Sequence, residues 1–120
     1  MCIFTDKATH LLADVNGYFI ADPAFTSLSP ARFLDTRSAT GTFDAGNVVA
    51  GPVAAGSTTK VNVRSRGMVP ANATAVVLNV TAVGPAADGF ATVFPCDEAV
   101  PVASNLNYQV GDDIPNAVIA

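Results

Sequence analysis

The segment from Ala75 to Val83 constrains the fold of this chain most, because its residues alternate without a break. One face of the segment is apolar and comprises Val76, Leu78, Val80 and Ala82. The other face is mixed and comprises Val77, Asn79, Thr81 and Val83. A period of two residues is typical of a β-strand that buries one side, so we predict a strand over residues 75–83.

Shorter apolar or alternating runs, separated by turn residues, predict the remaining strands. These runs are Met1–Thr5, Leu11–Ile20, Lys60–Arg64, Phe90–Phe94, Ser104–Tyr108 and Asn116–Ala120. The loop Gly84–Gly89 is rich in turn residues and predicts a β-hairpin between strands 75–83 and 90–94. Asp22-Pro23 is expected to end the second strand. We expect residues 24–55 to be irregular, with Phe33-Leu34 and Val48-Val49 as short apolar islands.

Composition supports the same fold class. Nine glycines and eight prolines are spread along the 120 residues and leave few places for long helices. We therefore predict one all-β domain over residues 1–120, an antiparallel β-sandwich of the jelly-roll or Ig-like kind with seven to eight strands. Its core is expected to contain Leu11, Val15, Val61, Val63, Val76, Leu78, Val80 and Leu106.

The charge and the apolar runs limit the partners. Six Lys and Arg against ten Asp and Glu give a net charge of -4, whereas a nucleic-acid-binding surface needs a basic stripe. We expect no nucleic-acid partner. No apolar run approaches the roughly 18 residues of a membrane-spanning helix, so we expect no membrane span.

Cys2 and Cys96 leave two readings open: a disulfide in an exported protein, or two inert buried thiols. Zinc is excluded on ligand count, because the chain has one histidine and no C-x-x-C motif. Glutamate occurs once and the strands are rich in Thr and Asn, which suits export. We therefore favour the disulfide, which stabilises by about 4–5 kcal/mol in the chain-entropy model for a loop of this size.

The charged residues Arg32, Asp35 and Arg37 form the most suggestive cluster. Guanidinium groups on either side of a carboxylate can clamp a ligand or make a structural ion pair that ties a loop to a sheet. The apolar pair Phe33-Leu34 between them indicates that this segment packs inward. We interpret the cluster as structural.

Other candidate sites lack the spacing that their chemistry needs. On a strand, His10 and Asp14 lie about 13 Å apart, too far for a base and its orienting acid. The acidic pairs Asp97-Glu98 and Asp112-Asp113 lack the pattern of a calcium loop, and Gly84–Gly89 lacks the Lys-Ser/Thr of a phosphate loop. We therefore predict no enzyme, no catalytic residue, no metal and no cofactor.

Carbohydrate binding is the rival function for a secreted β-sandwich. Polar and aromatic residues of the alternating strands offer a ligand face for sugar hydroxyls: Asn79, Thr81, Asn105, Asn107 and Tyr108. The asparagines and the threonine equally suit cross-strand polar ladders, and tryptophan, the usual sugar platform, is absent.

The block Ser29–Arg37, which reads SPARFLDTR, resembles the SPARLLDTR signature of a domain common in secreted actinobacterial proteins. Further similar blocks are Val69–Ala71, Ala75–Val83, Gly89–Cys96, Ser104–Tyr108, Asn116–Ile119, Cys2–Thr5 and Thr9–Phe19. In that family the Cys-Ile-Phe-Thr block comes last, whereas here it comes first, so the chain resembles one unit of a tandem array in a shifted frame. The resemblance implies secretion and use as a tandem or accessory module beside hydrolase domains, without a settled activity.

We therefore expect a non-enzymatic structural or interaction module of an extracellular or cell-surface tandem-repeat protein, acting as spacer, stalk or display element. Its partners would be copies of itself or neighbouring repeats. The alternative is a module that binds carbohydrate or cell-wall glycan for an attached hydrolase. The apolar ends of the chain suggest that terminal strands seek partners. Asn116–Ala120 would pair with Cys2–Thr5, either within one chain or from one copy to the next.

Overall fold

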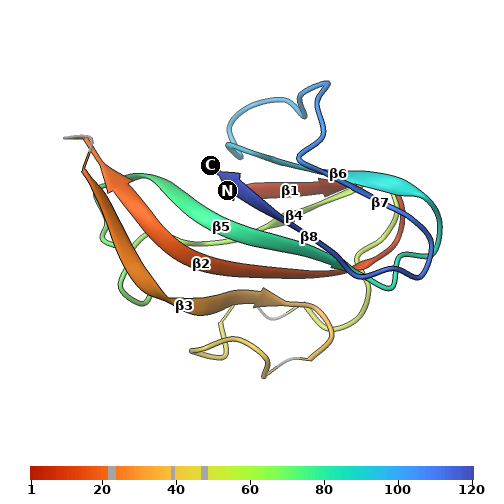
Figure 1. Ribbon diagram of the computed structural model, residues 1–120, viewed down its shortest axis with the longest axis horizontal. Helices are drawn as coiled ribbons and strands as arrows, with labels where there is room; N and C mark the ends of the chain where they lie inside the picture. The colour runs from red at the N-terminus through yellow and green to blue at the C-terminus, as the bar shows by residue number, and fades with distance from the viewer. Residues whose placement is uncertain (22–23, 39, 47–48) are drawn as a thin grey trace.

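The structure, a computed structural model, describes residues 1–21, 24–38, 40–46 and 49–120. It is an antiparallel β-sandwich of eight strands in two four-stranded sheets, as predicted (Figure 1). The strands are β1 (Cys2–Thr5), β2 (His10–Ile20), β3 (Phe25–Asp35), β4 (Ser57–Lys60), β5 (Ala73–Val83), β6 (Gly89–Phe94), β7 (Leu106–Tyr108) and β8 (Ile114–Ile119). Within the described ranges, no helix is long and apolar enough to cross a membrane.

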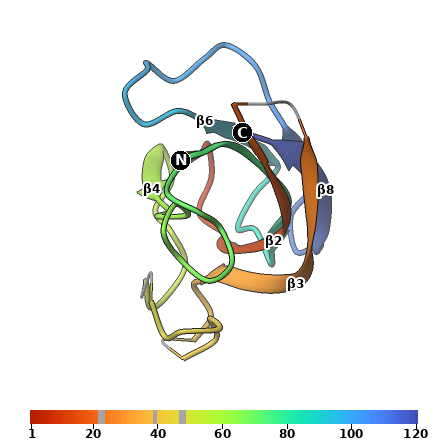
Figure 2. The same ribbon diagram turned by 90° about the vertical axis from the view of Figure 1, so that its left-hand side faces the viewer.

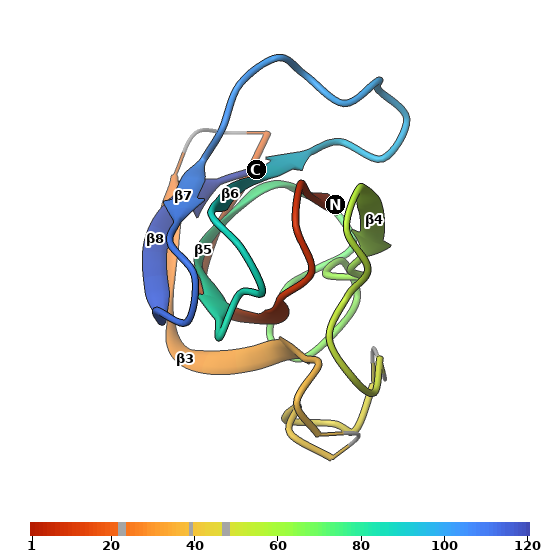
Figure 3. The same cartoon turned by 90° about the vertical axis from the view of Figure 1, so that its right-hand side faces the viewer.

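The two sheets have four strands each but differ in the length of their strands. The β1 sheet has the order β4-β1-β6-β7, and the β5 sheet has the order β3-β2-β5-β8. In the β5 sheet, β2, β3 and β5 each span 11 residues. Strands β7 and β8, from different sheets, lie side by side along one edge of the sandwich, where the side-chain amide of Asn116 donates to the carbonyl oxygen of Asn105 (Figure 3).

The core lies between the two sheets, and the sequence predicted its lining. The eight predicted core residues are all buried, with no exposure at Leu11, Val15, Val61, Leu78 and Val80. Alternation along β5 places Val80 inward while Asn79 and Thr81 face outward. The predicted strand faces are therefore confirmed.

The predicted hairpin between β5 and β6 is wrong. β5 pairs with β2 and β8, whereas β6 pairs with β1 and β7 in the other sheet. The loop over residues 84–88 crosses from one sheet to the other, with Pro85 buried on the way. Turn residues predict that the chain reverses direction, but they do not determine whether the next strand joins the same sheet.

The expectation that residues 24–55 are irregular is also wrong for β3. This strand forms the edge of the β5 sheet, and its first residues are exposed, so no alternation marks it. Three residues, 28–30, lie opposite Asn16 in a bulge. A bulge on an edge strand is where a sheet accepts a proline such as Pro30. The predicted stop at Asp22-Pro23 and the island residue Val48 lie outside the described residues.

The predicted strand at Lys60–Arg64 is displaced along the chain. The strand itself is Ser57–Lys60, and Val61 and Val63 follow it as buried residues of an extended segment. The backbone of Val61 still exchanges hydrogen bonds with Met1, at 2.9 and 3.1 Å, so pairing with β1 continues past the strand end.

The terminal strands do not pair with each other. β1 lies between β4 and β6 and has no free edge, whereas β8 lies at the edge of the β5 sheet and pairs with β5. The expectation that the last strand pairs with the first strand within one chain is therefore wrong. Met1 and Ala120 line the same pocket, and the two ends of the chain lie near each other (Figure 2).

Candidate functional site

Polar side chains form a row across the outer face of the β5 sheet. Arg32 on β3 lies opposite Asp14 on β2, and Asp14 lies opposite Asn79 on β5. The guanidinium of Arg32 donates from Nε to Oδ1 of Asp14 at 2.7 Å and from Nη2 to Oδ2 at 3.0 Å. This hydrogen bonding raises the pKa of Arg32 and holds its side chain along the sheet.

Asp35, at the end of β3, is a buried carboxylate held by two arginines. Arg37 donates to it from Nε at 3.1 Å, from Nη2 at 2.9 Å and from its backbone N–H at 3.0 Å, and Arg32 adds a contact of 3.3 Å from Nη1. The hydrogen bonds from Arg37 outweigh the cost of burial and lower the pKa of Asp35. The structure thus brings Arg32, Asp35 and Arg37 together and adds Asp14, which the sequence suggested only as a partner of His10.

The loop after β3 closes over this carboxylate. A Cβ atom at Gly41 would lie 2.6 Å from Oδ2 of Asp35, so the backbone approaches as closely as a glycine allows. Thr36 ties the same turn to β2, because its Oγ1 accepts the backbone N–H of Leu11 at 2.9 Å and lies 3.1 Å from Nδ1 of His10. The loop therefore covers the Asp35 carboxylate, and His10 contacts Thr36, which fixes the turn to β2.

Arg66 forms a second set of contacts that fixes the loop after β3 to the strand, and the sequence did not predict it. Its Nε lies 2.7 Å from Oδ2 of Asp44, and its Nη1 donates to the carbonyl oxygen of Phe33 at 2.8 Å. The guanidinium also lies over the rings of Phe33 and Phe43, at 4.8 and 5.2 Å from their centroids. Its hydrogen bonds lower the pKa of Asp44 to about 2. The sequence contains an arginine and an aspartate that can form an ion pair, but 22 positions separate Arg66 from Asp44, so nothing local indicates that they meet.

The five residues proposed as a ligand face do not share one face. Asn79 and Thr81 lie on β5, whereas Asn107 lies on β7 in the other sheet. Tyr108 is buried, and its hydroxyl donates to the carbonyl oxygen of Lys7 at 3.1 Å, so it belongs to the core. Oδ1 of Asn105 accepts the N–H of Val93 at 2.7 Å. The error came from treating two sheets as one surface.

The acidic loop residues serve as caps for backbone groups. Asp113 accepts the N–H of Gly84 at 3.0 Å, and Asp88 accepts the N–H of Val110 at 2.9 Å. In the described part of the chain, no group of three or more His, Cys, Asp or Glu side chains is placed to hold a metal ion.

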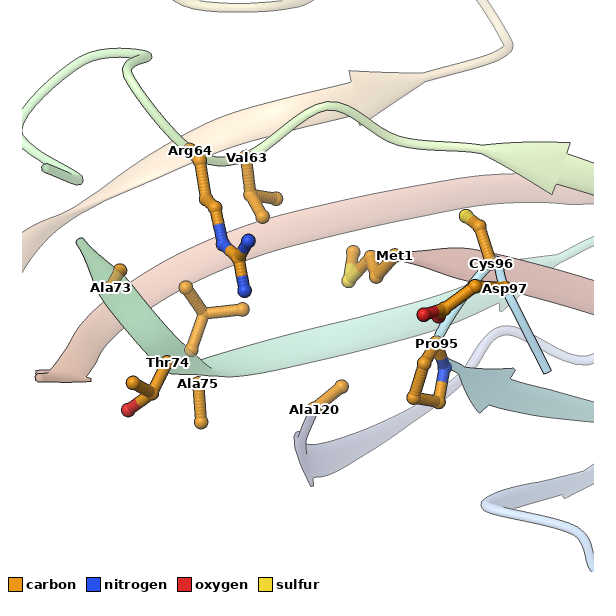
Figure 4. Close-up of a pocket in the computed structure, with 11 residues that line it drawn as sticks. Met1, Val63, Arg64, Ala73, Thr74, Ala75, Pro95, Cys96, Asp97 and Ala120 are labelled. Carbon is orange, nitrogen blue, oxygen red and sulfur yellow. The ribbon is translucent and has the colours of Figure 1, made fainter. Parts of the chain in front are cut away.

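A pocket of about 310 Å³ is lined by both terminal residues, Met1 and Ala120 (Figure 4). Arg64 and Asp97 reach into it from opposite sides, and the disulfide residue Cys96 forms part of its wall. Its volume is at the lower limit of small-molecule sites, which measure about 300–1,000 Å³. The sequence did not point to this pocket, because its lining comes from segments far apart in the chain.

The predicted disulfide between Cys2 and Cys96 is present, with Cα atoms 5.0 Å apart. Cys2 and Phe94 lie on the outer side of the β1 sheet, yet both are buried, whereas Cys96 is exposed. The loop over residues 95–105 is held to the β1 sheet at two places. Near its start it is held by this disulfide, and near its end the carbonyl oxygen of Ala103 accepts a hydrogen bond from the hydroxyl of Thr92 on β6. The disulfide thus fixes one end of a loop that exposes Val102.

An aromatic pair occupies the other half of the outer face of the β5 sheet. The rings of Phe19 and Phe25 lie 5.4 Å apart, and Phe25 is half exposed. The Phe25 ring fills the space that a side chain at Gly17 would need, since its Cε2 lies 2.4 Å from a Cβ built there. In the neighbouring row, Val77 lies beside Ile119, which is also exposed.

Comparison with known proteins adds no further assignment, since no family model, characterised protein or solved structure matches this chain.

Proposed function

We propose that the protein is a non-enzymatic structural module of an extracellular or cell-surface protein, acting as spacer, stalk or display element. The observation that carries this proposal is how the charged side chains are used. Arg32, Asp35 and Arg37 bind one another, and the backbone of Gly41 covers their carboxylate. Charged groups that bind one another in this way stabilise the fold and are not free to bind a ligand.

The disulfide supports the extracellular or cell-surface location in this proposal. Disulfides persist in oxidising environments and are rare in the cytosol. The bond between Cys2 and Cys96 spans 94 positions and joins the start of the chain to the loop after β6. A module that must keep its shape without chaperones or cofactors gains from such a covalent link.

A second candidate function is the binding of cell-wall carbohydrate on the outer face of the β5 sheet. The observation that favours it is the position of Phe25, half exposed on the same face as the Arg32–Asp14–Asn79 row. A sugar ring stacked on an aromatic side chain could direct its hydroxyls to such a polar row. Phenylalanine offers this apolar surface without the polar atom of tryptophan.

Sedimentation with purified peptidoglycan and a glycan array test the two functions against each other. The structural module is expected to show no saturable binding to either. Saturable binding that Phe25→Ala abolishes, and that Phe43→Ala retains, would overturn the structural proposal in favour of the carbohydrate module. Phe43 is a suitable control because it is similarly exposed but packs against Phe33 in the loop after β3.

A further inference from the structure

Strand β8 is an edge strand without charged residues. Among the described residues, β5 alone pairs with it, and its sequence is IPNAVI. Pro115, Asn116 and Ala117 are exposed, and Ile119 is 66% exposed, although β7 lies beside β8 (Figure 3). Natural edge strands are usually protected by lysine, proline or a bulge, because their free backbone groups pair with other strands. β8 has one such residue, Pro115, and no lysine.

The hydrogen bonds to β5 determine which backbone groups are free. Ala120 and Val76 exchange both of their hydrogen bonds, at 2.7 and 3.1 Å. Bonded and non-bonded pairs alternate along an antiparallel ladder, so Val118 and Asn116 also bond to β5. The backbone groups of Ile119, Ala117 and Pro115 therefore point away from β5, towards the free edge.

We propose that two copies of the protein pair through β8, antiparallel and centred on Ala117. At the two-fold axis, each Ala117 would donate its N–H to the carbonyl oxygen of the other Ala117. One register step away, the N–H of Ile119 would donate to the carbonyl oxygen of Pro115 in the second copy. The two β5 sheets then become one continuous sheet.

The side chains of β8 fit this register. Ala117 has a small side chain at the axis, where two identical residues must lie opposite each other. Each exposed Ile119 comes to lie opposite Pro115 of the second copy, so an apolar side chain gains an apolar neighbour. Proline has no N–H to donate, so a register centred on Pro115 would lack the hydrogen bonds at its centre. Such a contact is self-complementary and closes as a dimer.

This inference names a partner for the proposed structural role and rests on it, yet the two fail separately. A monomeric protein would overturn the β8 contact and leave the spacer role in place. Saturable glycan binding would overturn the spacer role without affecting the contact.

Cross-linking tests the register. A cysteine in the variant Ala117→Cys would face its copy across the axis within the 4.4–6.8 Å Cα separation that a disulfide accepts. We expect the purified variant to form a covalent dimer on mild oxidation, with the Cys2–Cys96 bond intact by peptide mass analysis. The matched control is Ser29→Cys on β3, the opposite edge of the same sheet, which should stay monomeric. Equal cross-linking of both variants, or of neither, would overturn the proposal.

A proline substitution tests the hydrogen bonds without disturbing the fold. Ala117→Pro removes an N–H that points to the free edge and leaves the ladder to β5 complete, as Pro115 already does one step earlier. Sedimentation velocity from low micromolar to millimolar protein should show a concentration-dependent dimer for the wild type and a monomer for Ala117→Pro at unchanged melting temperature. Pro115→Ala, which adds an N–H, should strengthen the dimer. A wild type that stays monomeric, or a proline variant that dimerises as well as the wild type, would contradict the contact.

Discussion

Asp35 and Arg37 lie two residues apart and bind each other through both side chain and backbone. Nη2 of Arg37 lies 2.9 Å from Oδ2 of Asp35, and the backbone N–H of Arg37 donates to Oδ1 at 3.0 Å. The carboxylate is 3% exposed. One buried side chain therefore fixes both the turn at the end of β3 and the arginine that covers it.

Lowering the pH should weaken the fold through the paired carboxylates. Folding lowers the pKa of Asp35, and it lowers that of Asp44 to about 2, whereas the pKa of an unfolded aspartate is about 3.9. The unfolded state therefore binds protons first, so the stabilisation is complete above about pH 5 and is lost as the pH falls through the folded values. Urea unfolding between about pH 6 and pH 2 measures this loss. A variant carrying Asp35→Asn and Asp44→Asn should show a flatter profile, and an equal slope in both proteins would refute the assignment.

Arg66 is expected to matter more for stability than its neighbour Arg64. Arg66→Ala removes the ion pair with Asp44, the hydrogen bond to the carbonyl oxygen of Phe33 and the stacking on that ring. We expect a loss of about 2–4 kcal/mol in the free energy of unfolding, measured by chemical denaturation. Arg64→Ala, at an exposed position, should stay within about 0.5 kcal/mol. Equal losses would show that Arg66 does not brace the loop.

Val80 and Val77 lie on opposite faces of β5, Val80 in the core and Val77 on the outer face. Val80 has no exposed surface, whereas Val77 is half-buried on the opposite face. Val80→Ala should cost more than about 1 kcal/mol through lost transfer energy and a cavity, and Val77→Ala should cost less. Thermal unfolding of both variants measures the difference. The reverse order would invert the assignment of the faces of β5.

Loss of the disulfide is expected to destabilise the whole domain. Replacing both Cys2 and Cys96 by alanine should cost about 2–5 kcal/mol, because the unfolded chain is no longer closed over 94 positions. It should also free the loop over residues 95–105, which limited proteolysis would cut first. Melting temperature and cleavage sites are to be compared with the oxidised protein. An unchanged melting temperature would mean that the sheets alone hold the fold.

The sequence predicted the parts of the fold that local pattern determines. Strands β2 and β5 bury one face, so alternation reveals both the strands and the core residues such as Val80. β3 remained hidden because an edge strand with exposed Ser and Thr residues has no apolar face, and its bulge at Pro30 interrupts the period. Its strand geometry comes from pairing with β2, which is not encoded within the segment itself.

The candidate site was predictable only where its residues lie close in sequence. Arg32, Asp35 and Arg37 were found together because they lie within six positions. Asp14 joins them only through the pairing of β2 with β3, and Asp44 meets Arg66 only through the folded loop. The division of the strands between two sheets likewise separates Asn79 from Asn107, which no turn signal could reveal.

Equilibrium unfolding of the variant Asp35→Asn tests most directly whether the arginine cluster holds the fold or awaits a ligand. The substitution keeps the size of the side chain but removes the charge that two arginines share. Asp35 is buried, whereas the arginines that remain are 31% and 44% exposed and can be solvated, so we expect a loss of about 1.5–3 kcal/mol in the free energy of unfolding at neutral pH. An unchanged unfolding midpoint would contradict the structural role of Asp35 and would leave Arg32 and Arg37 available to an anionic ligand.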